Sequence, residues 1–143
     1  MILPAIHHQG GVRACRFVRI DLHHGKSKEE LSVISRSIHQ AMVETIDVPE
    51  DDYFQVITPH PPGELLYDTG YMNISRSEQQ MFVQITMKEG RPLRKKQALY
   101  ARMTELLEMN AKVRPQDVMI ILTENTQENW SFGNGVAQLA PEA

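Results

Sequence analysis

The chain repeats itself at an offset of 65 residues (Phe17 to Phe82), and this repetition constrains its fold more than any other feature. Without a gap, residues 17–20 (FVRI) align with residues 82–85 (FVQI), and Gly25 aligns with Gly90. Further along, Val48 aligns with Val113 and Asp52 with Asp117; the apolar positions Ile34, Ile38 and Met42 align with Leu99, Met103 and Leu107. Such a gapless run indicates two copies of one structural unit.

Each copy has the pattern of a strand, a helix and a second strand. In the first copy we expect strands at 16–23 and 53–58, with a helix between them that ends near Ile46 and begins at the capping-box sequence Ser27-Lys28-Glu29-Glu30. In the second copy we expect strands at 81–87 and 117–123, with a helix that has Pro92 as its first residue and ends near Ala111.

These units predict a single α/β (α+β) domain. It comprises an N-terminal extension (1–15), two β-α-β units (16–58 and 81–123), a connecting loop with a short hairpin (59–80) and a C-terminal loop and tail (124–143). Two such units predict a four-stranded mixed sheet with both helices on one face. Residues 118–122 are apolar on both faces of their strand, so the second face also needs cover, and we expect copies of the chain to associate.

The composition narrows the class of partner. Apolar residues make up 41% of the chain and charged residues 23%, and the net charge is −3 without a basic tract, which argues against nucleic acid binding. No apolar run reaches membrane-spanning length, and the single cysteine, Cys15, fits a reducing compartment, so we expect a cytoplasmic protein. The pairs His7-His8 and His23-His24 are poor chelators, because adjacent strand residues point to opposite faces, and no metal site is expected.

Three segments carry a resemblance to a known family: residues 48–52 (VPEDD), Gly90-Arg91 before the second helix, and residues 129–138 (NWSFGNGVAQ). Together with the tandem repeat, they resemble the tautomerase superfamily, nearest to its malonate semialdehyde decarboxylase branch. The resemblance implies a homotrimer that acts on small oxo or enol carboxylates without a metal or an organic cofactor.

Members of that superfamily use the amine of an N-terminal proline, and the resemblance places this proline immediately before Phe17. The chain has Arg16 there, whose nitrogen is an internal amide that is neither basic nor nucleophilic. A proline-based mechanism could still operate in two ways. Removal of the first three residues would expose Pro4, although ordinary processing of the initiator methionine does not do this. Alternatively, the native protein could start just before Phe17.

The resemblance also assigns the site. Asp52 would activate water or shuttle a proton, or would merely begin a strand as Asp117 does; the two interpretations weigh evenly. Arg91 would bind the substrate carboxylate. Lys88 lies near the position of a second cationic residue of the family, but an ordinary solvated charge is the favoured interpretation for it. Trp130 and Phe132 would form pocket walls with Leu139 as the floor, although packing at the core or between subunits is the commoner role for a lone tryptophan.

Two functions follow, and the sequence names no substrate for either. The first is a tautomerase, decarboxylase or hydratase whose activity is weak or altered because Arg16 replaces the proline. The second is a non-catalytic trimeric binding or structural protein whose N-terminal extension covers the pocket.

Overall fold

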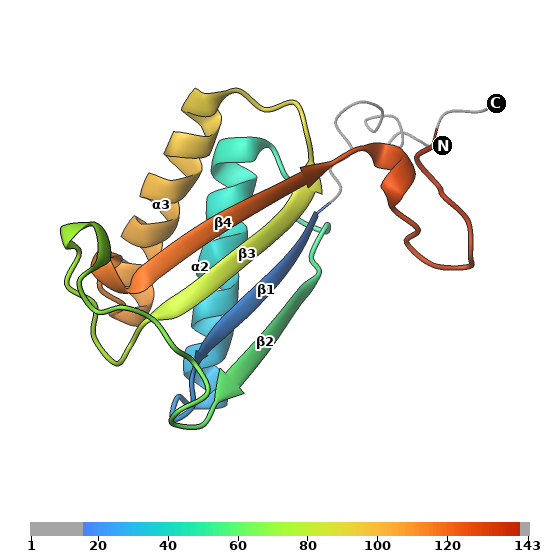
Figure 1. Cartoon of the computed structure of the whole chain (residues 1–143). Coiled ribbons are helices and arrows are strands. Elements are labelled where there is room, and N and C mark those ends of the chain that lie inside the picture. The colour runs from blue at the N-terminus through green and yellow to red at the C-terminus, as the bar shows by residue number, and fades with distance from the viewer. Residues whose placement is uncertain (1–15, 141–143) are drawn as a thin grey trace.

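The computed structural model describes residues 16–140 and contains two β-α-β units in sequence (Figure 1). The first unit is β1 (Arg16–His23), α2 (Lys28–Ile46) and β2 (Gln55–His60), and the second is β3 (Met81–Lys88), α3 (Leu93–Ala111) and β4 (Val118–Asn125). Short 3-10 turns lie at Tyr71–Asn73, Pro115–Asp117 and Gln127–Asn129. The extension expected at 1–15 lies outside the described residues.

The strands form one mixed sheet in the order β2-β1-β3-β4. Within each unit the two strands are parallel, and the units meet where β1 and β3 pair antiparallel, with Val18 opposite Ile85 and Ile20 opposite Val83. Both helices cover the same face of the sheet (Figure 1). The predicted fold class is therefore confirmed.

The duplication is visible at the level of backbone conformation. Gly25 and Gly90, one in each copy, have φ of 120° and 118°, values that residues with a Cβ rarely adopt. Asp47 and Lys112 end the two helices in the left-handed conformation, with φ of 61° and 58°. Each helix contains 19 residues. The 65-residue repeat is therefore a repeat of structure.

The two helices begin differently. Ser27 caps α2 through the expected box, in which Glu30 N donates to Ser27 Oγ (3.1 Å) and Ser27 N donates to Glu30 Oε1 (2.8 Å). Pro92 lies one position earlier than predicted: it has extended backbone angles and caps α3, and its carbonyl accepts from the amides of Lys95 and Lys96. Proline can take this place because its φ suits both conformations and it has no N–H to satisfy.

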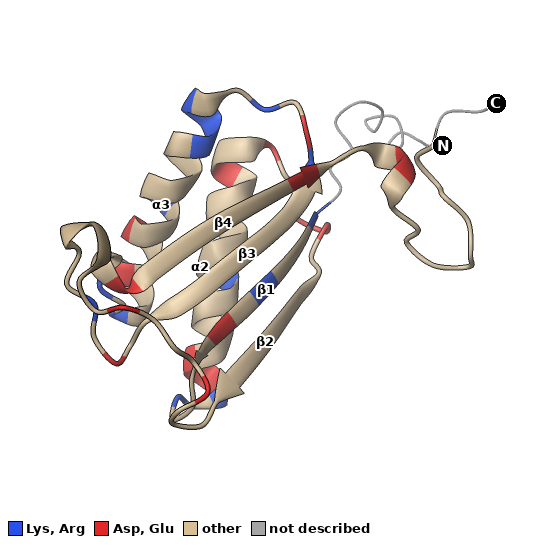
Figure 2. Ribbon diagram, viewed as in Figure 1, with Lys and Arg blue, Asp and Glu red and all other residues tan. Residues whose placement is uncertain are grey.

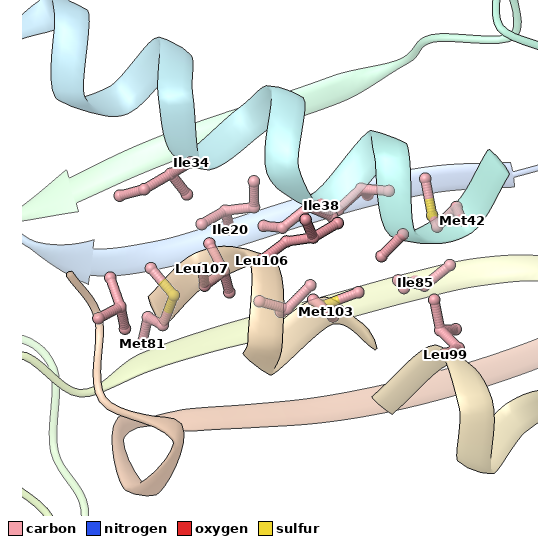
Figure 3. Packing of buried hydrophobic residues seen from close by; sticks show 14 of the residues in the cluster. Ile20, Ile34, Ile38, Met42, Met81, Ile85, Leu99, Met103, Leu106 and Leu107 are labelled. Atoms are coloured by element: carbon pink, nitrogen blue, oxygen red, sulfur yellow. The ribbon is translucent and has the colours of Figure 1, made fainter. Parts of the chain in front are cut away.

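The core lies between the helices and the inner face of the sheet (Figure 3). Strands β1 and β3 alternate buried and more exposed residues along their length, so every second side chain enters this layer. The side chains labelled in Figure 3 show the interdigitation: Ile20, Ile34, Ile38, Met42, Met81, Ile85, Leu99, Met103, Leu106 and Leu107.

The outer face of the sheet has no layer over it within residues 16–140. Val56 and Met119 on this face are 37% and 45% exposed, and the strands carry few acidic or basic residues apart from Arg19 and Asp21 of β1 (Figure 2). Neither helix in the described part of the chain is long and apolar enough to span a membrane.

The connection between the units differs from the prediction. No strand lies between β2 and β3 in the structure, so the expected hairpin is wrong. Instead Arg76 donates from Nη1 to the carbonyls of Tyr71 (2.8 Å) and Ile74 (3.2 Å), so a side chain provides hydrogen bonds to the backbone of this loop. Strand β2 also begins and ends two residues later than expected, because its pairing with β1 continues to His60.

Candidate functional site

The residues of interest meet at the end of the sheet where β1 and β2 begin and β3 and β4 end. Two loops border this end: residues 47–54, which connect α2 to β2, and residues 126–140, which follow β4 and project away from the helices (Figure 1). Because β1 runs antiparallel to β3, the start of one repeat and the end of the other lie together here.

A buried ion pair joins β1 to the first of these loops. Arg16 Nη1 lies 2.6 Å from Asp52 Oδ2, and the side chains are 0% and 13% exposed. The second carboxylate oxygen, Asp52 Oδ1, is buried and has no hydrogen-bond partner among the described residues. A buried acceptor without a partner is costly, and this oxygen can remove that cost by taking up a proton.

Burial is the largest influence on Asp52 and raises the pKa of its carboxyl above the ordinary value, while the nearby charge and hydrogen bond of Arg16 act in the opposite direction. Its repeat-mate Asp117 is surrounded differently: its carboxylate is fully buried and accepts from Ser77 N (2.7 Å) and Ser77 Oγ (2.6 Å). Asp117 therefore anchors Ser77 through hydrogen bonds, whereas its repeat-mate Asp52 keeps one carboxylate oxygen without a hydrogen-bond partner among the described residues.

Aromatic side chains form a wall beside the ion pair. Trp130 and Phe132 stack with ring centroids 5.7 Å apart and an interplanar angle of 14°, and Phe132 lies 6.2 Å from Phe54. Trp130 Nε1 donates to Asn125 Oδ1 at the end of β4 (2.6 Å). This bond fixes the indole relative to the sheet.

The loop that carries the wall is braced by Gln138. Its Oε1 accepts from Phe132 N (2.9 Å), and its Nε2 donates to the carbonyl of Gly133 (2.8 Å). Gly133 and Gly135 have φ of 133° and 73°, so the tight turn between Phe132 and Gln138 favours glycine at these two positions.

Two adjoining cavities lie against this wall and share Phe54 and Phe132. One is about 320 Å³, and its lining includes Asp52, Phe132, Gln138 and Leu139. The other is about 270 Å³, and its lining includes Arg16, Trp130 and Phe132. A few polar groups in a mainly apolar concavity are typical of a small-molecule site.

The structure thus brings together five of the seven residues singled out in the sequence: Arg16, Asp52, Trp130, Phe132 and Leu139. Arg91 and Lys88 are not among the residues that line the two cavities. Arg91 donates from Nε to the Ile46 carbonyl (3.1 Å) and from Nη1 to the Lys88 carbonyl (3.0 Å), so it connects the end of α2 to the end of β3.

Three residues of the site had no role in the sequence-based assignment: Phe54, Asn125 and Gln138. Phe54 follows Asp52 by two positions, and Gln138 ends the segment that carried the family resemblance, so both had a positional signal. Asn125 had none, because only the fold brings it to Trp130.

His23 and His24 belong to no candidate metal-binding group within residues 16–140. Residues 16–140 contain no group of three or more His, Cys, Asp or Glu side chains that could hold a metal ion. His23 lies beside Tyr67, with ring centroids 6.0 Å apart, and His24 is exposed. His7, His8 and Cys15 lie outside the described residues.

Comparison with known proteins identifies the class. A family described as tautomerase enzyme matches residues 52–133, more than half of the chain, and a second family of the same description matches residues 17–68. The probable tautomerase YusQ of Bacillus subtilis (strain 168) is 43% identical over 123 residues, which cover 86% of this chain and 97% of the relative. The chain therefore belongs to the tautomerase superfamily.

Solved structures place it near one branch. A malonate semialdehyde decarboxylase, studied for its decarboxylase and hydratase activities, has a TM-score of 0.81 at 28% identity and covers 86% of this chain and 95% of its own. The FG41 malonate semialdehyde decarboxylase inhibited by 3-bromopropiolate has a TM-score of 0.80 at 34% identity, with coverage of 85% and 92%. A fused 4-OT symmetric trimer, at 15% identity and a TM-score of 0.71, with coverage of 88% and 99%, shares the fold.

Proposed function

We propose that the protein binds a small oxo or enol carboxylate between the Arg16–Asp52 pair and the aromatic wall, and that it carries out tautomerase, decarboxylase or hydratase chemistry at a reduced or altered level. The observation that carries this proposal is the buried carboxyl group of Asp52, which lies in the lining of a cavity with Phe54 and Phe132 and has one oxygen without a hydrogen-bond partner among the described residues. A carboxyl group with a raised pKa can hold a proton at higher pH than an ordinary aspartate and return it, which suits proton transfer to an enol.

The roles divide between charge and shape. Asp52 handles the proton or a water molecule, and Phe54, Trp130, Phe132 and Leu139 exclude solvent around the ligand. Arg91 is the proposed anchor for the ligand carboxylate, and Lys88 is a secondary cation. To reach the ligand, the Arg91 guanidinium would exchange its backbone carbonyl acceptors for the carboxylate, a stronger, charge-assisted pairing.

Arg16 is the reason for expecting reduced or altered chemistry. It occupies the first position of β1, opposite Met87, where the family resemblance places the proline amine. An internal amide there is neither base nor nucleophile. A non-catalytic binding protein is therefore the second candidate function, and the suggestion that residues 1–15 cover the pocket concerns residues outside the described structure.

We further propose that the protein is a homotrimer in the cytoplasm. The uncovered, weakly charged outer face of the sheet supports association, and the fused 4-OT trimer provides the precedent for the symmetry. The single cysteine of the chain favours a reducing compartment.

The catalytic proposal is tested by following ketonisation of the enol of a 2-oxo acid through its ultraviolet absorbance. We expect slow turnover by the full chain that falls at least about tenfold in Asp52→Asn and in Arg91→Ala. A variant in which residues 1–16 are replaced by Met-Pro should gain activity once its initiator methionine is removed. Equal rates for wild type and Arg91→Ala would reject the assigned carboxylate anchor, and saturable enol binding without turnover would favour the binding protein.

A further inference from the structure

A face of α2 holds the loop that carries Asp52. His39 on this face is 8% exposed; its Nε2 donates to the carbonyl of Glu50 (2.9 Å), and its ring stacks on Tyr53 with centroids 4.5 Å apart and an interplanar angle of 24°. One turn earlier, Ser35 Oγ donates to Gln55 Oε1 (2.6 Å). Since that hydroxyl proton is committed, the Tyr53 hydroxyl donates to Ser35.

His39 thus contacts the chain on both sides of Asp52. It binds the backbone at residue 50 and the side chain at residue 53, so Asp51 and Asp52 lie between two fixed points. The amide of Asp52 also donates to the Pro49 carbonyl (3.1 Å), which closes a tight turn. These contacts fix the backbone around Asp52 in the conformation in which its side chain pairs with Arg16.

The tautomer of His39 follows from its partner. Because Nε2 must donate to a carbonyl, Nδ1 is a bare acceptor whenever the ring is neutral, and it is buried without a hydrogen-bond partner in residues 16–140. Asp52 Oδ1 is likewise buried without a hydrogen-bond partner in residues 16–140. Burial is the main cause of the raised pKa of Asp52, and the charge of His39 is one of the weaker effects that oppose it, after Arg16.

Other charged groups border His39. Arg36 and Glu44 from α2, with Glu50 and Tyr53 from the loop, line a groove of about 450 Å³ beside it. Toward the candidate site, the same loop presents Asp52, which pairs with Arg16.

We propose that His39 is a positioning residue for Asp52: its contacts with Glu50 and Tyr53 hold the loop in the conformation in which the Asp52 carboxyl group pairs with Arg16. The role in turnover rests on the proposed function, whereas the coupling between the two side chains does not. None of the three sequence segments that carried the family resemblance lies in α2.

Because a protonated imidazole close to a carboxyl group lowers the pH at which that group titrates, the proximity of His39 to Asp52 is tested by carbon-detected NMR titration of the Asp52 carboxyl group in wild type, His39→Gln and His24→Gln. An effect of His39 on this titration is the coupling between the two side chains. Glutamine at position 39 can still donate to the Glu50 carbonyl but cannot become charged. We expect the Asp52 midpoint to move to higher pH in His39→Gln and to stay unchanged in His24→Gln, whose histidine is exposed. Identical midpoints in wild type and His39→Gln would overturn the coupling.

The positioning is tested by hydrogen exchange at the Asp52 amide. His39→Ala loses the bond and the stack, so exchange should be about tenfold faster than in wild type and should be largely restored in His39→Gln. Tyr53→Phe, which keeps the stack but loses the hydroxyl bond, provides a milder variant if His39→Ala does not fold, and we expect an intermediate rate. Unchanged exchange in both His39→Ala and Tyr53→Phe would overturn the positioning.

Neither experiment requires a ligand. A coupled Asp52 titration in a protein that turns over no enol would reject the proposed function and keep the His39 role. Turnover that is abolished by Asp52→Asn but has the same rate and pH profile in wild type and His39→Gln would support the proposed function. It would reject a role for His39 in that function.

Discussion

At the scale of single residues, the two copies of one aspartate have diverged. Asp117 accepts two hydrogen bonds from Ser77 and lies 3.5 Å from Arg114 Nε, whereas Asp52 has one strong partner and one open oxygen. The sequence suggested both roles for Asp52 with equal weight, because the repeat alone cannot tell an anchor from a reactive group. The difference arises from the partners, which come from other elements.

Asp117→Ala should destabilise the protein by about 2–4 kcal/mol, because it removes a fully buried acceptor and leaves the Ser77 donors without a partner. Urea unfolding measures this change. Glu89→Ala, at an exposed position, serves as the control and should change the free energy of unfolding by less than about 0.5 kcal/mol. A loss of that small size in Asp117→Ala would contradict the anchor role.

The pKa of Asp52 makes stability depend on pH with a definite sign. Burial raises the folded-state pKa, so the group favours folding while protonated, below its unfolded pKa, and this contribution is lost as the pH rises through the folded pKa. Between about pH 3 and about pH 7 the free energy of unfolding of wild type should therefore fall relative to Asp52→Asn. Parallel urea unfolding at the two pH values measures it; a relative rise would mean that the ion pair with Arg16 outweighs burial.

At the scale of elements, helices and strands were predictable because periodicity and capping are local. The α2 capping box lies where the sequence predicts it, and both helix ends fall at the expected residues. The predicted hairpin is absent, and the segment instead contains hydrogen bonds from Arg76 within the loop, which no periodic pattern encodes. For the site, Trp130 and Phe132 were found by their motif, whereas Asn125 and His39 became visible only in the fold.

Gln138→Ala should loosen the C-terminal loop, because it removes both hydrogen bonds that close the turn around Gly133. Since Trp130 is the only tryptophan, its fluorescence anisotropy reports on this loop directly, and we expect it to fall while global stability changes by less than about 1 kcal/mol. Gln127→Ala, earlier in the same segment, provides the comparison. Equal anisotropy in wild type and Gln138→Ala would show that the brace is dispensable.

At the scale of the whole molecule, the sheet has one face covered by helices and one face with no described cover (Figure 1). The exposed apolar side chains on this face, such as Val56 and Met119, would be buried if another copy covered it. The repeat in the sequence predicts the order of the helices and strands. It does not predict how copies of the chain associate, because that depends on surfaces that a single chain does not bury.

Ile121→Lys should weaken the proposed trimer, because Ile121 lies opposite Gln84 and therefore on the outer face. Size-exclusion chromatography with light scattering should give three times the chain mass for wild type and a smaller species for Ile121→Lys. Gln97→Lys, on the exposed side of α3, should leave the mass unchanged. A monomeric wild type at about 10 µM would contradict the assembly.

The central claim is that the pocket between the Arg16–Asp52 pair and the aromatic wall takes a small carboxylate. Titration with malonate, followed by Trp130 emission, tests it most directly in wild type, Arg91→Gln and the exposed control Arg94→Gln. We expect a saturable change in wild type and in Arg94→Gln, and a dissociation constant about tenfold higher in Arg91→Gln. No saturable change in folded wild-type protein would contradict it.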